Sequence, residues 1–290
     1  MVLNRKFVFN IDEKLQNREV KYILENELRC SANIISKLKQ GEYILLNNKH
    51  VTGRQKVRTG DKLEIILPDE RSDNIVKNSD IKFQILFEDD DILVVDKPAN
   101  IPTHPSLNHY SDTLANGVIN YYDGHFTFRA VNRLDRETSG VVLIAKNILS
   151  AHLLSDQVKK RKITKIYYAI TENIPENETG EINAPIARER ESIIKRCVRE
   201  DGKEAKTIFK IIEKNDKNAL VKAEPVTGRT HQIRVHFSHI GCPLFGDKMY
   251  GSKVENERVR LHCKKIIFNH PITDEVLCIE CDLPDDFNII

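Results

Sequence analysis

The sequence predicts an α+β fold built around a largely antiparallel sheet. Strand-like apolar runs outnumber helix-like ones, and most runs are separated by short turn sequences typical of hairpins. The composition, 40% apolar and 30% charged, is that of a globular protein. A chain of 290 residues has room for one large and one small domain. We expect a small unit at residues 13–68, a polar linker at 69–80 and a large unit at 81–290.

The small unit has the spacing of two helices followed by three short strands. Apolar residues at helical intervals predict helices over 18–28 and 32–40. The second helix should begin after Ser31 as its N-cap and end with Gly41 at the C′ position. Strands are expected at 43–46, near 51 and at 63–67, with turns at 47–48 and 60–61.

The large unit opens with two apolar runs on either side of three consecutive aspartates, which predicts a hairpin. Helices are expected over 112–122 with Asp112 as cap, over 149–160 with Asn147 as cap, and over 230–239. Further strands are expected at 141–145, 163–170, 205–212, 219–224, 260–268 and 276–281. The sequence has no internal repeat or low-complexity tract.

Basic residues are concentrated in two segments, although the whole chain carries a net charge of only +2. Residues 37–62 hold seven Lys/Arg against two acids, and residues 129–165 hold nine against three. Such segments indicate a polyanion bound at a defined place. The alternative is a solvated surface that is balanced by acidic residues elsewhere in the chain.

Several classes of protein are not indicated. No apolar stretch approaches the roughly 18 residues that a membrane-spanning helix needs. The N-terminus lacks the apolar segment of a signal peptide. Six cysteines are too few for a disulfide scaffold. We therefore expect a cytoplasmic protein with reduced thiols and no membrane partner.

Asp135 is the first candidate for chemistry. It lies between Arg133 and Arg136, in a polar loop just before an apolar strand. Neighbouring guanidinium groups favour the ionised form of a carboxyl group, which could then act as nucleophile or base. By spacing alone, a surface cluster of ion pairs explains the same residues.

Neither the histidines nor the cysteines indicate a metal site. His231, His236 and His239 lack the spacing of paired zinc ligands, so capping and solvated imidazoles are the simpler explanation. Cys278 and Cys281 form a single C-x-x-C, whose side chains would face opposite ways on a strand. Because phosphate-binding glycine motifs are also missing, we expect no metal and no nucleotide cofactor.

At residues 132–140, NRLDRETSG, the sequence resembles the RluA-type pseudouridine synthases. Further matches occur in the family's order: Asp96-Lys97-Pro98, then the strand at 165–169, then 202–207, and then GRTHQIRVHFSHIGCPLFGDKMYG at 228–251. Together these segments span about residues 82–283. The resemblance implies a pseudouridine synthase catalytic domain with a mixed, largely antiparallel sheet.

Residues 13–67 resemble the small S-four-like (αL) RNA-binding domain that often precedes such enzymes. The match covers the helix, turn and hairpin layout of SANIISKLKQGEYILLNNKHVTGRQKVRTGDKLEI. The resemblance implies RNA contacts from the basic helix and loop, at Lys37, Lys39 and Arg54.

The resemblance also implies roles in catalysis. Asp135 matches the essential nucleophile or base, Tyr167 matches the residue that stacks on the flipped base, and Arg234 matches the arginine that pairs with the catalytic carboxylate. The Tyr167 phenol is also a candidate acceptor for the proton on carbon five of the base. Further substrate contacts are expected from the residues around these motifs, namely Asn132, Arg133, Arg136, Arg229, Thr230 and His231. Asn132 departs from the family, which usually has histidine there.

The implied function is the isomerisation of specific uridines in structured RNA to pseudouridine by a monomer without cofactors. Large-subunit ribosomal RNA is the expected substrate, and transfer RNA is the alternative. Two other functions stay open: an RNA-binding module without catalysis, and a glycosidic hydrolase. A hydrolase usually needs a second carboxylate, and neither Glu137 nor Asp247 has an evident pairing with Asp135. Removing residues 1–78 should weaken RNA binding more than folding.

Overall fold

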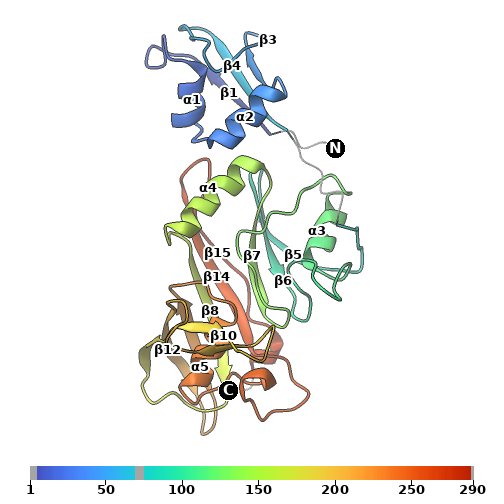
Figure 1. Cartoon of the computed structure of the whole chain (residues 1–290). Helices are drawn as coiled ribbons and strands as arrows, with labels where there is room; N and C mark the ends of the chain where they lie inside the picture. The colour runs from blue at the N-terminus through green and yellow to red at the C-terminus, as the bar shows by residue number, and fades with distance from the viewer. Residues whose placement is uncertain (1–4, 69–74, 289–290) are drawn as a thin grey trace.

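Two hydrophobic cores organise the computed structural model, which describes residues 5–68 and 75–288 (Figure 1). The smaller core lies in an N-terminal unit, and the larger core lies in the unit that follows it. This agrees with the predicted α+β fold class. The 69–74 part of the predicted linker lies outside the described residues. Within the described ranges, no helix combines the length and the apolar character required to cross a membrane.

The N-terminal unit is a four-stranded antiparallel sheet covered by two helices. Its elements are β1 (Arg5–Asn10), α1 (Val20–Asn26), α2 (Ala32–Gln40), β2 (Ile44–Leu46), β3 (Lys49–His50) and β4 (Lys62–Leu67), with strand order β1-β4-β2-β3. Ser31 caps α2 as predicted and accepts the N–H of Ile34. The Gly41 prediction is only half right, because Gly41 has φ −93° and Glu42 takes the left-handed conformation. The prediction did not include β1.

The large unit is a nine-stranded mixed sheet with the order β5-β6-β7-β14-β8-β13-β12-β9, and β15 pairs with β14. Its strands are β5 (Gln84–Glu88), β6 (Ile92–Lys97), β7 (Ser139–Ala145), β8 (Thr164–Thr171), β9 (Thr179–Asn183), β12 (Lys206–Lys214), β13 (Ala219–Pro225), β14 (Leu261–Asn269) and β15 (Val276–Glu280). A separate hairpin joins β10 (Ile186–Arg188) and β11 (Arg196–Val198). The prediction missed β9, β10 and β11. Among the described strands, only β7 and β14 pair in parallel.

The sheet divides at β14. The first residues of β14 pair with β7, at His262–Ser139 and Cys263–Gly140, whereas its later residues pair with β15. Since β8 occupies the other edge of β14, β7 and β15 diverge from the same edge. Gly140 has φ +111°, and a Cβ there would lie 2.3 Å from the carbonyl oxygen of Cys263. Only glycine therefore allows this close approach.

The described part of the large unit has three α-helices, α3 (Leu114–Tyr121), α4 (Ile148–Lys159) and α5 (Gln232–His239), and two short 3-10 helices at Lys248–Tyr250 and Asp285–Phe287. Asn147 caps α4 as predicted. The cap of α3 is Thr113 and not Asp112, because Thr113 forms a reciprocal capping box with Asn116. The α5 helix begins two residues later than predicted, since His231 has the left-handed φ of 57°.

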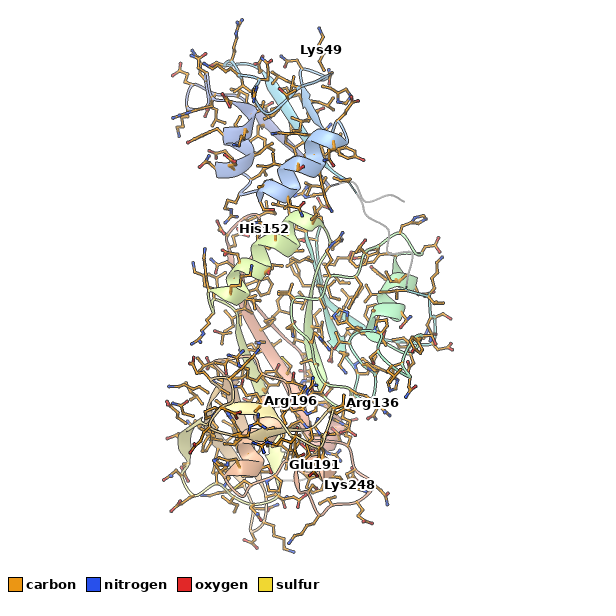
Figure 2. The ribbon with its side chains drawn as sticks, viewed as in Figure 1. Lys49, Arg136, His152, Glu191, Arg196 and Lys248 are labelled. Atoms are coloured by element: carbon orange, nitrogen blue, oxygen red, sulfur yellow. The ribbon has the colours of Figure 1, made fainter. Side chains whose placement is uncertain are left out.

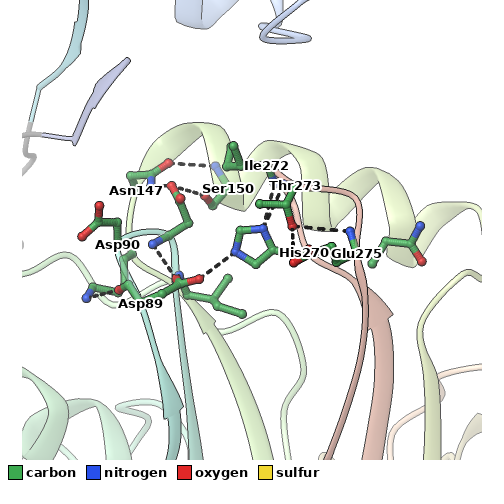
Figure 3. A network of polar contacts seen from close by, with 12 residues as sticks. Asp89, Asp90, Asn147, Ser150, His270, Ile272, Thr273 and Glu275 are labelled. Atoms are coloured by element: carbon green, nitrogen blue, oxygen red, sulfur yellow. Dashed lines mark hydrogen bonds and ion pairs between the residues drawn. The ribbon is translucent and has the colours of Figure 1, made fainter. Parts of the chain in front are cut away.

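The N-terminal unit is docked on α4 (Figure 1). Leu149 and Leu153 of α4 belong to the N-terminal core. Arg5 of β1 makes a two-bond contact with the buried Asp91, at 3.1 and 2.9 Å. Figure 3 shows the polar network beneath this contact, in which Asn147 donates to Asp91 and the His270 ring lies 2.8 Å from Asp89. The turns β5–β6 and β14–β15 are thereby joined to the start of α4.

Candidate active site

The loop at residues 132–138, which leads into β7, places Asp135 beside the start of α5. The Asp135 side chain is 28% exposed. Its Oδ2 lies 3.6 Å from Nη1 of Arg234, and its Oδ1 lies 3.9 Å from Nε2 of His231. Three residues expected in the site, from two distant parts of the chain, therefore meet around one carboxylate that solvent can reach.

Arg234 has a different main partner from the one expected. Its Nε and Nη2 donate to both oxygens of the buried Asp247, at 2.7 and 2.8 Å. The expected ion pair with Asp135 is present as a single, longer contact, because only Nη1 of Arg234 faces Asp135. Burial alone would lower the pKa of Arg234, but the bonds to Asp247 outweigh it and raise that pKa. Asp247 thus fixes a permanent cation beside Asp135.

His231 completes the wall around Asp135. Its Nδ1 lies 2.8 Å from the hydroxyl of Tyr250, and Arg234 stacks on the same Tyr250 ring at 5.0 Å. Burial lowers the pKa of His231, while the charge of Asp135 opposes that shift. A neutral imidazole therefore faces the carboxylate at neutral pH. His231 has a left-handed backbone at the start of α5, and its ring faces Asp135 of the loop.

Tyr167 lies on β8 and is buried, with 8% of the residue exposed. Burial raises its pKa well above 10, and Cys263, its partner on β14, and the charge of Asp135 add to this. The phenol is therefore neutral in this structure. Because the Asp135 charge acts on it, Tyr167 and Asp135 belong to one electrostatic environment.

Asn132 does not have the position expected of a substrate contact. Its side-chain amide is buried, donates to the carbonyl of Val141 at 3.0 Å and accepts the N–H of Leu143 at 2.8 Å. Both polar ends are thus used by the backbone of β7. The structure corrects the predicted role: Asn132 positions the loop that carries Asp135.

Lys97 and Thr103 also hold this loop, and neither was expected in the site. The buried Nζ of Lys97 donates to the carbonyls of Pro98, Ile101 and Arg136. Thr103 donates to the carbonyl of Leu134 at 2.8 Å. Lys97 lies in the first of the segments that resemble the family, so that motif was the available signal. Nothing in the sequence near Thr103 indicates its contact with Leu134.

A basic pocket of about 460 Å³ adjoins the site and contains two of the expected substrate contacts, Arg229 and Thr230. Its other basic lining residues are Arg188, Arg196 and Lys203. Arg229 donates to the carbonyl of Glu204 at 2.9 Å, and Thr230 is exposed. Figure 2 labels Arg196, and also Arg136 of the Asp135 loop, in the lower half of the molecule.

The other expected RNA contacts divide into two groups. Arg133 and Arg136 are exposed on the Asp135 loop, where Arg136 donates a 3.4 Å bond to the carbonyl of Asn100. Lys37, Lys39 and Arg54 belong to the N-terminal unit, at the other end of the molecule from α5 (Figure 1). They are not part of the Asp135 site.

The histidines that were weighed as metal ligands have other partners. His231 faces Asp135 and Tyr250, whereas the ring of His236 lies between Thr207 and the carbonyl of Ala184. Cys278 is exposed and Cys281 buried, as expected for positions three apart on an extended segment. Asp247 cannot serve as a second hydrolytic carboxylate, since Arg234 holds both its oxygens.

Comparisons with known proteins identify the family to which the chain belongs. Residues 91–239 match the family model described as RNA pseudouridylate synthase. The RNA pseudouridine synthase YhcT of Bacillus subtilis, described as uncharacterized, is 36% identical over 283 residues, which cover 95% of this chain and 93% of that protein.

Two relatives have names that state a substrate. Ribosomal large subunit pseudouridine synthase D of Haemophilus influenzae is 34% identical, over 81% of this chain and 77% of that protein. Ribosomal large subunit pseudouridine synthase C of Rickettsia felis is 31% identical, over 96% of each chain. Among solved structures, human RNA pseudouridylate synthase domain containing 1 superposes with a TM-score of 0.60 at 27% identity, covering 73% of this chain and 87% of that one.

Proposed function

The chain belongs to the RNA pseudouridylate synthase family and is an RNA pseudouridine synthase, and on that premise we propose that it modifies large-subunit ribosomal RNA with Asp135 as the reacting carboxylate. Two of its relatives are named as ribosomal large-subunit synthases, which supports this substrate. The basic segments of both units are suited to a large structured RNA.

The observation that carries the assignment is the placement of Asp135 between a fixed cation and a neutral imidazole. Arg234 is held by Asp247, so it presents a positive charge 3.6 Å from Asp135 without taking up both its oxygens. Attack on the ribose and removal of a ribose proton both require a carboxylate. The accessible face of Asp135 leaves room for the sugar.

The reaction is an isomerisation, in which the bond from ribose to a uracil nitrogen is exchanged for a bond to carbon five. A stacked base is out of reach, so the uridine must first be flipped into the site at a cost of a few kcal/mol. Tyr167 would stack on the flipped base from β8, and the basic pocket would hold the adjacent phosphates.

Replacing Asp135 by asparagine tests the assignment. We expect Asp135→Asn to abolish pseudouridine formation while RNA affinity and the circular dichroism spectrum stay close to wild type, because an amide keeps the shape but cannot react. The matched control is Glu137→Gln, which neutralises the other acid of the same loop. Asp135→Asn activity within tenfold of wild type would contradict the proposal.

Pseudouridine mapping of total RNA from cells with and without the gene tests the substrate. A site missing from large-subunit ribosomal RNA in cells without the gene is the expected result. Sites missing from transfer RNA alone would contradict the ribosomal assignment and leave the role of Asp135 untouched.

A further inference from the structure

Three potential metal ligands meet where β7 and β15 diverge from β14. They are Asp96 of β6, His262 of β14 and Cys281, which follows β15, and their ligand atoms all lie within 4.8 Å of one another. The sulfur of Cys281 lies 3.1 Å from Nε2 of His262, and a carboxylate oxygen of Asp96 lies within 4.8 Å of both atoms. Neither His262 nor Asp96 was considered as a ligand from the sequence.

The surroundings prepare His262 to bind through Nε2. Its ring is fully buried, and its Nδ1 lies 2.9 Å from the hydroxyl of Ser139. With the ring proton on Nδ1, the ring donates to Ser139 and Nε2 presents a lone pair toward Cys281. Second partners of this kind set the orientation and tautomer of histidine ligands in metal sites.

The third ligand, Asp96, lies on β6 and brings a carboxylate oxygen to the same cluster. The ammonium group of the adjacent Lys97 donates to the carbonyls of Pro98, Ile101 and Arg136. A carboxylate, an imidazole and a thiolate are the three kinds of side-chain ligand that zinc takes in proteins.

We propose that Asp96, His262 and Cys281 form a binding site for a thiophilic divalent metal ion of the zinc class, with a fourth position for water. Thiolate and imidazole ligands together favour zinc over magnesium or calcium, and three protein ligands with one open position are a common zinc arrangement. Binding displaces the thiol proton of Cys281. Cys278 is excluded because it is exposed.

The three proposed ligands are not among the residues that surround Asp135, so the metal ion takes no part in the isomerisation. It would join β6, β14 and the segment after β15, and through Ser139 it contacts the end of the Asp135 loop. An ion that binds only the folded chain raises its stability. We therefore expect zinc to raise the melting temperature of the metal-stripped, full-length protein.

Cobalt(II) titration of the full-length protein tests the ligand set, because cobalt bound to a thiolate has a charge-transfer absorption in the near ultraviolet. The wild type should develop this absorption with one equivalent of cobalt. Cys281→Ser should lose it, and the matched control Cys278→Ser should keep it. No absorption in the wild type, absorption that persists in Cys281→Ser, or loss in Cys278→Ser would each overturn the proposal.

A second variant, which keeps all three ligands, tests the proposal independently in case Cys281→Ser does not fold. Ser139→Ala should weaken zinc affinity by about 10–100-fold, the usual effect of removing a hydrogen-bond partner of a metal-bound histidine. Unchanged affinity in Ser139→Ala would mean that His262 does not bind the ion. Pseudouridine formation is measured in parallel, so failure of the metal site and failure of the Asp135 assignment remain distinguishable.

Discussion

Tyr167 has the environment of a neutral phenol within electrostatic reach of the reacting carboxylate. Its ring provides an apolar face for a base, and it pairs across the sheet with Cys263 of β14. An oxygen that accepts the carbon-five proton must first be ionised. Since burial raises the Tyr167 pKa well above 10, phenolate is a minor form at neutral pH, and a rate that depends on it should rise with pH.

Phenylalanine and alanine at position 167 separate stacking from proton transfer. We expect Tyr167→Phe to bind RNA like the wild type but to stall after the base has been rotated, and Tyr167→Ala to lose roughly 1–3 kcal/mol of binding. Single-turnover rates measured across pH 6–10 provide the check. A wild-type rate in the Phe variant, or a pH-independent rate in the wild type, would leave Tyr167 as a stacking ring alone.

The Arg234–Asp247 pair makes a second prediction at the scale of single residues. Asp247→Asn should lower the free energy of unfolding by about 3–5 kcal/mol, because it leaves a buried guanidinium without its ionic partner. It should also slow catalysis, since Arg234 can then turn to Asp135 and take up its oxygens. Urea unfolding followed by circular dichroism measures the first effect, as the chain has no tryptophan.

The control for Asp247→Asn is Asp123→Asn. Asp123 forms an exposed ion pair with Lys77 at 2.6 Å, with 84% of its side chain in solvent. Water screens such a pair, so the substitution should change stability far less. Equal effects of the two substitutions would show that burial of the Arg234–Asp247 pair has no special energetic role.

These residues also show how far the sequence could predict the site. Asp135, His231 and Arg234 were expected through motif resemblance, and the structure brings them together. The pairing of Arg234 with Asp247 and of Asn132 with β7 could not be predicted, since both depend on which side chains the fold buries. When a polar side chain is buried, its hydrogen-bonding groups pair with the neighbouring backbone, so it supports the structure and does not contact the substrate.

At the scale of elements, the helices and strands that depend on local sequence were predicted best, and those that depend on long-range pairing were predicted worst. The caps Ser31 and Asn147 act within one turn of their helices, so the sequence around them was sufficient. By contrast, β1 pairs with β4 across more than fifty residues, and only one of its side chains is buried. The strands β10 and β11 are three residues each, too short for an alternating pattern.

The missed β10–β11 hairpin supplies a prediction about RNA binding. Arg196 of β11 and Lys203 line the basic pocket beside the site. Replacing both by alanine should weaken RNA binding regardless of sequence, and should reduce the slope of log affinity against log salt by roughly 0.7–0.9 for each phosphate that is no longer neutralised. Filter binding over a range of salt concentrations measures this slope.

Lys217→Ala is the control for the hairpin variant. Lys217 is exposed on the turn between β12 and β13, outside the lining of the basic pocket. Its removal should leave the salt slope within error of the wild type. An equal decrease in slope for both variants would indicate a diffuse charge effect and no defined phosphate site.

At the scale of the whole molecule, the docking of the N-terminal unit changes what its removal should do. A polar linker alone suggested two separable units. The structure instead buries Leu149 and Leu153 of α4 in the N-terminal core and pairs Arg5 with Asp91. Burial of one leucine side chain contributes roughly 1.5–3 kcal/mol, so the large unit depends on this interface for stability.

Removal of residues 1–78 should therefore lower the melting temperature as well as the RNA affinity. The truncation exposes the apolar side chains of Leu149 and Leu153, which lowers solubility. The same truncation with Leu149→Ser and Leu153→Gln should be more soluble, because polar side chains then replace that apolar surface. In the repaired fragment the loss of affinity should shrink as salt rises, since the missing Lys37, Lys39 and Arg54 act on phosphates.

Calorimetry measures the melting temperature, and filter binding measures the RNA affinity. A plain truncation with the melting temperature of the full chain would show that the interface adds no stability, and an affinity equal to wild type at low salt would remove the N-terminal unit from RNA binding.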